Sequence, residues 1–215
     1  MSVSMKDSCD FRALASIRLR TAEPSCVLED HKKLNGDHAL QIGLQGPYTS
    51  GKPKPAVVLV PVVEREEPTV LFTVRAASLR EHSGQVAFPG GRVDAHDPTL
   101  FDAALREADE EVGLPRDKVD FLGYLDVYLS GTNYLVMPIV AMVKPDFSLR
   151  LNPQEVSDVF EVPLSVLMDP ARHELHSREW KGVLRHYYAI SFEQRYIWGV
   201  TAGIVRNMYE RLFRS

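Results

Sequence analysis

Short runs of apolar residues in the first half of the chain predict β-strands. The valine-rich stretch Ala56–Glu64 and the alternating stretch Thr69–Arg75 are separated by Pro68, which is typical of a hairpin. Pro61 within the first stretch indicates an edge position or a bulge, because proline cannot donate to a strand ladder. A further short strand is predicted at Gln85–Phe88.

Apolar runs return after a helical stretch in the middle of the chain and predict a second hairpin. They are Val119–Leu129 and Asn133–Val143, with Ser130-Gly131-Thr132 between them. Helical spacing predicts two further helices, at Asp10–Arg20 and at Tyr196–Phe213. Strands on both sides of a buried helix favour an α+β layered fold over a doubly wound sheet.

The central helix is predicted at Asp97–Leu114. Asp97 suits the N-cap, Pro98 suits the first helical position, and Gly113 suits the left-handed turn that ends a helix. An apolar stripe that should face the core recurs at Phe101, Leu105, Ala108 and Val112.

The same helix carries three carboxylates that fall together on another face. They belong to Glu107, Glu110 and Glu111. Clustered like charges oppose helix formation, so they require either full solvation, with Arg106 paired to Glu110, or a counter-ion. The upstream pair Gly90-Gly91 lets the backbone approach closely and offer a carbonyl ligand, and hard oxygen ligands are those that Mg²⁺ or Mn²⁺ prefers. In this context the pattern favours a divalent metal site.

Length and charge narrow the possible classes of protein. A chain of 215 residues with 45% hydrophobic content predicts one domain, with a helix and irregular lead-in at 1–55 and the main domain at 56–215. The net charge of −4, with both signs interspersed, predicts no nucleic-acid partner and no polybasic membrane patch.

The chain is expected in the cytoplasm. Met1–Arg20 has no apolar signal-peptide core, and the longest apolar run, Ala56–Val63, is far shorter than the ~20 residues that span a bilayer. Cys9 and Cys26 are expected to be reduced thiols, with a disulfide between them as the alternative.

Residues Arg106–Leu114, with the sequence READEEVGL, resemble the second half of the Nudix box, REUxEExGU, in which U is apolar. The first half departs from the family pattern, because Pro98 occupies the glutamate position and one extra residue places Asp97 there instead. This departure is similar to the coenzyme A pyrophosphatase branch, whose box carries such an insertion. The chain also resembles the signature of that branch upstream, at Arg75-Ala76, Arg80, Gly84, Phe88-Pro89-Gly90-Gly91 and Asp94.

The resemblance implies a Nudix-type α/β/α sandwich, in which a mixed central sheet carries a catalytic loop-helix-loop. It also implies hydrolysis of the diphosphate bond of coenzyme A, in free, oxidised or acylated form, to 3′,5′-ADP and 4′-phosphopantetheine. Mg²⁺ or Mn²⁺ held by Glu107, Glu110 and Glu111 would bridge to the phosphate oxygens. Arg106 would orient a neighbouring carboxylate, either Glu110 or Asp97.

The general base would be a carboxylate near the attacked phosphorus, either Glu155 or an uncoordinated box glutamate. Glu155 belongs to Pro153–Pro163, a segment that resembles the acidic element many Nudix proteins carry after the hairpin. Glu161 is the competing residue, and a surface position on a short helix is the alternative for both.

Substrate binding is assigned to the glycine pair Gly90 and Gly91 and to two arginines. Arg75 and Arg80 would contact phosphate oxygens of the nucleotide half, because the guanidinium fork matches phosphate. Surface salt bridges are the alternative for each arginine. The histidines between residues 172 and 186 fit no tight metal motif and are assigned no ligand role, and the final helix is assigned packing only.

Two other functions are possible for such a chain. It could hydrolyse ADP-ribose, a dinucleoside polyphosphate or a damaged nucleotide, because the box specifies metal and bond type rather than leaving group. It could also be a non-catalytic nucleotide sensor, although all three box glutamates are retained, which argues against that function. The partner in each case is a small molecule, and the oligomeric state is left open, a homodimer included.

Overall fold

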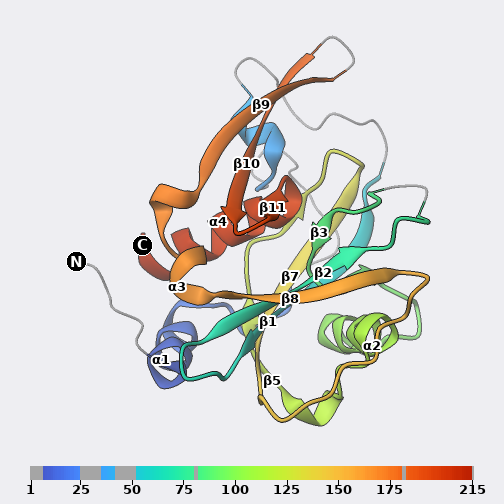
Figure 1. Ribbon diagram of the computed structural model, residues 1–215, viewed down its shortest axis with the longest axis vertical. Helices are drawn as coiled ribbons and strands as arrows, with labels where there is room; N and C mark the ends of the chain where they lie inside the picture. Colours follow the sequence, from blue (N-terminus) through green and yellow to red (C-terminus); the bar gives the residue numbers. More distant parts are fainter. Residues whose placement is uncertain (1–6, 25–34, 42–51, 80–81, 181–182, 215) are drawn as a thin grey trace.

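The computed structural model describes residues 7–24, 35–41, 52–79, 82–180 and 183–214. A mixed eight-stranded sheet forms its centre, with the path β3-β2-β1-β7-β5 (Figure 1). β1 and β7 run parallel along their whole length, and the other neighbours in this sheet pair antiparallel. The strands are β1 (Lys54–Val63), β2 (Thr69–Arg75), β3 (Val86–Ala87), β4 (Gly90–Arg92), β5 (Val119–Tyr124), β6 (Tyr128–Leu129), β7 (Tyr134–Val143) and β8 (Val156–Pro163).

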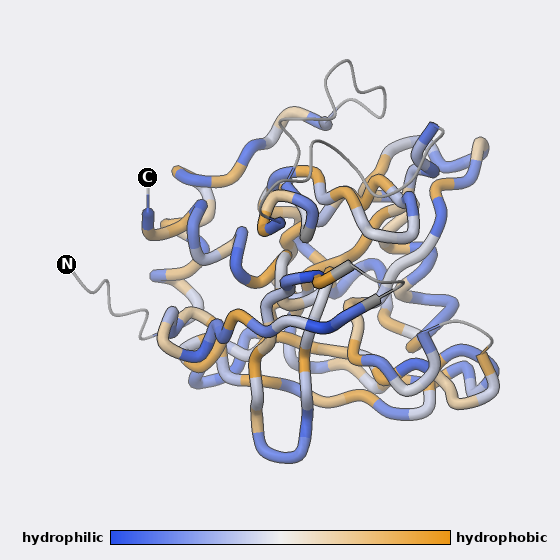
Figure 2. The backbone as a smooth tube through the Cα atoms, turned by 90° about the horizontal axis from the view of Figure 1, so that it is seen from above, coloured by the Kyte–Doolittle hydropathy of each residue, from blue (hydrophilic) through white to orange (hydrophobic). Residues whose placement is uncertain are grey.

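Helices cover both faces of the main sheet. α2 (Leu100–Val112) packs on one face, against Val57, Leu59 and Val63 of β1. The opposite face carries Val60 and Val62 and packs against α1 (Ser8–Arg18), α3 (Leu164–Leu167) and α4 (Val200–Phe213). Side chains of β1 therefore alternate between two cores, and the most hydrophobic segments lie in the interior strands (Figure 2). This arrangement confirms the predicted α/β/α sandwich with a mixed central sheet.

A second, three-stranded sheet is formed by the C-terminal part of the chain (Figure 1). Its strands are β9 (Glu174–Trp180), β10 (Val183–Phe192) and β11 (Arg195–Trp198), in the order β11-β10-β9. The Thr201 hydroxyl at the start of α4 donates a hydrogen bond of 3.0 Å to the Val86 carbonyl in β3, which fastens this sheet beside the main one. The predicted start of the last helix at Tyr196 is wrong, because this residue pairs with β10 as part of β11.

Two further predictions and one alternative are wrong. Pro61 lies neither at an edge nor in a bulge, because β1 is a central strand paired with β7 along its whole length. On its other side, β1 pairs with β4 at residues 56–58 and with β2 at residues 62–63, and Pro61 lies between these two pairings. α2 begins at Leu100 rather than at Pro98, because the Thr99 hydroxyl accepts a hydrogen bond from the Asp102 amide and caps the helix. The segment that contains Glu161 is strand β8 and not a short helix.

Most other predicted elements are present. β1 pairs with β2, and β5 and β6 pair with β7, as the two predicted hairpins require. α1 overlaps the predicted Asp10–Arg20 and is capped by Asp7. Much of the predicted lead-in, with Cys26, lies outside the described residues; Cys9 is an exposed free thiol. Among the described residues, no helix is both long and apolar enough to cross a membrane.

Candidate active site

α2 is held in one orientation by its two ends and its apolar side. Gly113 has φ 66° and ψ 32°, the left-handed conformation that ends the helix where the sequence predicted. Leu105, Ala108 and Val112 are buried against the main sheet. Rotation of the helix about its axis would expose these side chains to water, so the direction of its glutamates is fixed.

Arg106 joins the loop before α2 to two carboxylates of the helix. Its Nε and Nη2 each donate a hydrogen bond of 3.0 Å to one carboxylate oxygen of Asp97. Its Nη1 donates to Glu107 Oε1 at 2.9 Å and to Glu110 Oε2 at 3.3 Å, and its Nη2 also donates to the Arg92 carbonyl at 3.0 Å. The hydrogen bonds with Arg106 hold the pKa of Asp97 below its usual value. Arg106 thus contacts both carboxylates that the sequence offered as alternatives.

Glu107 lies directly behind Gly91. A Cβ atom at position 91 would overlap the Glu107 carboxylate, so the present position of that carboxylate depends on glycine there. Burial raises the pKa of Glu107, and the hydrogen bond from Arg106 opposes that rise.

Glu111 is the most deeply buried acid of the helix, with 4% of its surface exposed. The Gly90 amide donates a hydrogen bond of 3.2 Å to Glu111 Oε2. Burial raises the pKa of Glu111 to about 8. Near neutral pH the protonated form is therefore favoured unless a cation compensates the charge.

Glu155 approaches the box from the turn before β8. The Asn152 amide donates a hydrogen bond of 2.9 Å to the Glu111 carbonyl, which ties this turn to α2. Glu155 Oε1 accepts a hydrogen bond of 3.1 Å from Asn152 Nδ2. The charge of Glu155 contributes to the raised pKa of both Glu107 and Glu111, so the three acids share one electrostatic environment.

Glu161, the competing acid, is engaged elsewhere. Arg65 donates to it twice, from Nη2 to Oε1 at 2.7 Å and from Nε to Oε2 at 3.1 Å. The Thr69 hydroxyl donates to it as well. Glu161 is therefore an ion-pair partner on β8, and Glu155 is the acid of this segment that faces the box.

The glutamates of α2 are the kind of ligand that a divalent cation prefers, although their side chains accept hydrogen bonds from other groups of the protein. Within the described ranges, no group of three or more Asp, Glu, His or Cys side chains is placed to hold a metal ion. Glu107 and Glu110 accept hydrogen bonds from Arg106, and Glu111 accepts one from Gly90. The donors nevertheless fit Mg²⁺ or Mn²⁺, because they are hard oxygens and because the buried charge of Glu111 requires compensation.

Arg75 acts electrostatically on Glu111, since its charge lowers the pKa of that carboxyl group. Its Nε is buried and has no hydrogen-bond partner among the described residues. The Arg75 amide donates to the Gln85 carbonyl at 3.0 Å and the Gly84 amide donates to the Arg75 carbonyl at 3.0 Å, so the turn before β3 holds its backbone. Arg80, the second predicted arginine, lies outside the described residues.

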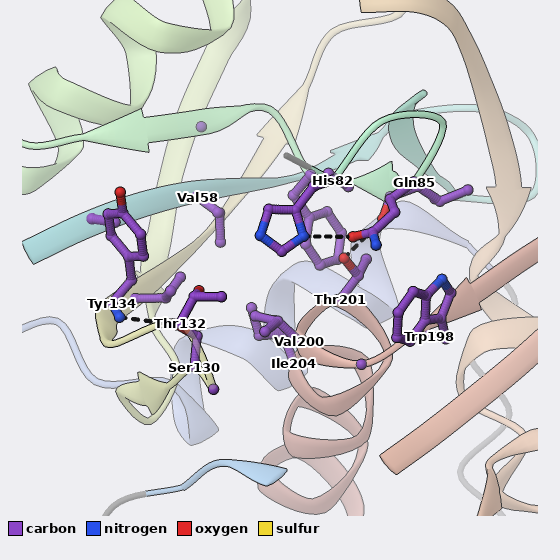
Figure 3. Close-up of a pocket in the computed structure, with 18 of the residues that line it drawn as sticks. Val58, His82, Gln85, Ser130, Thr132, Tyr134, Trp198, Val200, Thr201 and Ile204 are labelled. Carbon is purple, nitrogen blue, oxygen red and sulfur yellow. Dashed lines mark hydrogen bonds between the residues drawn. The ribbon is translucent and has the colours of Figure 1, made fainter. Parts of the chain in front are cut away.

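A cavity of about 550 Å³ opens beside the glycine pair (Figure 3). This volume is within the range of small-molecule sites, which is about 300–1,000 Å³. Tyr134 and Trp198 lie at opposite ends of the cavity, and Val200 and Ile204 of α4 line it between them (Figure 3). Arg75, Gln85, Phe88, Gly90 and Gly91 also line it, and the two glycines contact the glutamates of the box.

The C-terminal wall of this cavity is the part of the site that the sequence did not predict. Trp198, Thr201 and Ile204 line it, so the final segment forms part of the site in addition to packing. The available signal was Gly199, which has φ 60° and marks a strand-to-helix turn directly after Trp198.

Comparison with known proteins gives a consistent set of relatives. Residues 52–183 match the family model of the NUDIX domain. The Uncharacterized Nudix hydrolase NudL of Photorhabdus laumondii subsp. laumondii is 42% identical over 157 residues, which cover 73% of this chain and 84% of that protein. The protein of the same name from Cronobacter sakazakii is 45% identical over 161 residues, which cover 71% of this chain and 80% of that protein. The match to the family model ends at the first residue of β10.

Proposed function

The chain belongs to the Nudix hydrolase family, and from this premise we propose that it hydrolyses the diphosphate bond of coenzyme A to 3′,5′-ADP and 4′-phosphopantetheine. One observation carries this proposal. Four of the upstream residues that resemble the coenzyme A branch line one cavity, which adjoins the box: Arg75, Phe88, Gly90 and Gly91. Part of a signature that is spread along the sequence thereby lies on a single surface.

Glu107, Glu110 and Glu111 would hold the divalent cation, as Mg²⁺ or Mn²⁺. When bound, the ion supplies charge neutralisation at the phosphate oxygens and lowers the pKa of a coordinated water. It would also offset the effect of burial on the pKa of Glu111, because the buried carboxylate gains an opposite charge.

The chain's own side chains divide the remaining tasks. Arg75 would bind a non-bridging oxygen of the diphosphate, since Arg75 lines the cavity and its charge acts on Glu111. Arg106 would position Glu107 and Glu110 through the hydrogen bonds that also hold Asp97.

The general base would be Glu155, with the exposed Glu110 as the alternative. In either case the carboxylate takes one proton from the attacking water, a new phosphorus–oxygen bond forms, and the anhydride bond to the other phosphate breaks. Glu155 is favoured because its charge acts on both Glu107 and Glu111. Glu110 is engaged by Arg106, although 54% of its side chain stays exposed.

A mass-resolved product assay tests this function. Coenzyme A, ADP-ribose and a dinucleoside polyphosphate are each incubated with the protein and either Mg²⁺ or Mn²⁺, beside Glu111→Gln and a matched Asp109→Asn control. We expect coenzyme A to give 3′,5′-ADP and 4′-phosphopantetheine with the wild type and the control, and no product with Glu111→Gln. Asp109 is exposed on the same helix, so its replacement leaves the box intact.

Each other outcome refutes a stated part of the proposal. Cleavage of ADP-ribose or of the dinucleoside polyphosphate alone would keep the hydrolase and reject coenzyme A as its substrate. Binding of a nucleotide without cleavage of any substrate would favour a sensor. Full activity in Glu155→Gln would reject Glu155 as the general base.

A further inference from the structure

The face of the β9–β10 hairpin that borders the cavity carries two arginines directly opposite each other. Arg178 on β9 and Arg185 on β10 are paired in the antiparallel register, and both line the cavity. Directly paired residues point to the same face of a sheet, with Cβ atoms about 4.5–5.5 Å apart. The two guanidinium groups therefore stand on one wall of the cavity.

Two arginines in this position can contact one anion together. Cross-strand pairs of like charge are destabilising, whereas an anion between two arginines receives charge-assisted hydrogen bonds from both. Arg178 is exposed to solvent, and Arg185 is partly buried. The pair thus offers an anion site at the mouth of the cavity.

An aromatic pair lies further along the same wall. Tyr187 follows Arg185 by two residues on β10 and shares its face, and its ring packs edge-on against Trp198 with ring centroids 5.4 Å apart. Both side chains line the cavity, and Trp198 marks one of its ends (Figure 3). Aromatic rings of this kind provide a stacking surface for a nucleobase.

The wall is anchored on the side of the main sheet that leads to the box. Trp198 continues through Gly199 into α4, where Thr201 bonds to β3. On the same face of this sheet, Tyr196 Oη of β11 lies 2.9 Å from His176 Nδ1 of β9. Arg185, Tyr187 and Trp198 all lie beyond residue 183, where the match to the family model ends, so the family pattern does not specify them.

We propose that this wall binds a nucleoside that carries a second phosphate away from the hydrolysed bond. The base would lie against Tyr187 and Trp198, and the separate phosphomonoester would lie between Arg178 and Arg185. The inference rests on the proposed function, because coenzyme A has such a group in its 3′-phosphate. It assigns the nucleotide half to the end of the cavity at Trp198 and the pantetheine half to the end at Tyr134.

Binding of product fragments tests the site without requiring turnover. Adenosine 3′,5′-bisphosphate and adenosine 5′-monophosphate are titrated by calorimetry into the wild type, Arg185→Gln, Arg178→Gln and Trp198→Leu. Arg172→Gln is the charge-matched control, since Arg172 is an exposed residue outside the cavity. Unfolding in urea confirms that each variant is folded.

We expect Arg185→Gln to weaken the bisphosphate about tenfold and the monophosphate less than about twofold, because one charge-assisted contact is lost. Arg178→Gln should have the same selectivity with a smaller effect, because its side chain is exposed. Trp198→Leu should weaken both nucleotides to the same degree. Arg172→Gln should change neither affinity.

Several results would overturn this site. They are equal affinity of the wild type for the two nucleotides, equal loss of both in Arg185→Gln, or no loss in either arginine variant. The outcome is separable from the proposed function. If the protein hydrolyses coenzyme A but the arginine variants bind the bisphosphate as tightly as the wild type, the function is kept and the site is rejected. If the protein binds the bisphosphate selectively but does not hydrolyse coenzyme A, the site is kept and the function is rejected.

Discussion

Replacement of Glu111 with glutamine should stabilise the metal-free protein at alkaline pH although it abolishes activity. The wild-type carboxyl group is 4% exposed, and burial raises its pKa from 4.5 to about 8. The unfolded chain exposes the same group to water, so the folded state binds its proton more tightly. Its contribution to stability is fully present below pH 4.5 and is lost as the pH rises to about 8.

The size of this effect follows from the shift in pKa. At about 1.36 kcal/mol per pKa unit, the shift from 4.5 to about 8 corresponds to about 5 kcal/mol. Relaxation and entry of water reduce such penalties, so we expect about 2–4 kcal/mol. Glutamine is neutral at every pH, and its side-chain oxygen can accept the hydrogen bond that the Gly90 amide donates to Glu111. The variant should therefore lose the penalty and keep the contact.

Urea unfolding in EDTA, at steps between about pH 5 and about pH 9, measures the effect. The unfolding free energy of Glu111→Gln minus that of the wild type should increase by the stated amount across this range. Asp109→Asn, an exposed acid of the same helix, should follow the wild type. Addition of Mg²⁺ should stabilise the wild type more than Glu111→Gln. A difference that is the same at both ends of the range would refute the buried, protonated carboxyl group.

Three further predictions concern other contacts. Gly91→Ala should lower turnover at least about tenfold, because its methyl group displaces the end of the Glu107 side chain. It should lower the unfolding free energy by no more than about 1 kcal/mol, because nothing else is displaced. A larger loss of unfolding free energy in urea, or unchanged turnover in the product assay, would contradict this. Asp97→Asn should lower activity about 10- to 100-fold and raise the Mg²⁺ concentration for half-maximal activity, because Arg106 loses one of its charged partners. An unchanged metal titration would count against that role. His173→Gln should reduce the loss of stability that the wild type shows below pH 6.5. Burial lowers the pKa of His173, so the unfolded chain takes up the proton first as the pH falls. A melting temperature that falls between about pH 7 and about pH 5 as steeply in the variant as in the wild type would reject this prediction.

Local sequence signals predicted the elements that carry the box. The left-handed cap at Gly113 and the apolar stripe of α2 are properties of a few neighbouring residues, so they could be recognised without the fold. The start of α2 could not be placed in the same way. Asp97 and Thr99 are both good caps, and only the position of Arg106 in space explains why Asp97 is used for an ion pair.

The cavity depends on contacts between distant parts of the chain. The strand β9 is mostly polar, and the apolar residues of β10 are consecutive rather than alternating, so neither has the apolar alternation that marks a strand in the sequence. The prediction of an edge or a bulge at Pro61 is wrong for a related reason. A proline is accommodated there because β1 changes its pairing partner at that point, which is a property of the sheet and not of the strand. Arg75 could be singled out by resemblance, but its closeness to Glu111 comes from the folded chain.

The two sheets of this molecule carry different parts of the proposed activity. The groups proposed to break the bond all precede Val156, while the groups proposed to recognise the nucleotide follow Glu174 and belong to another sheet. Mutations in the later segment can therefore alter which molecule is accepted without disturbing the hydrolytic residues. The β9–β10 hairpin and the start of α4 could therefore be replaced together by the same segment of a relative. Such a chimaera should acquire the substrate preference of the relative and keep the metal dependence of this protein.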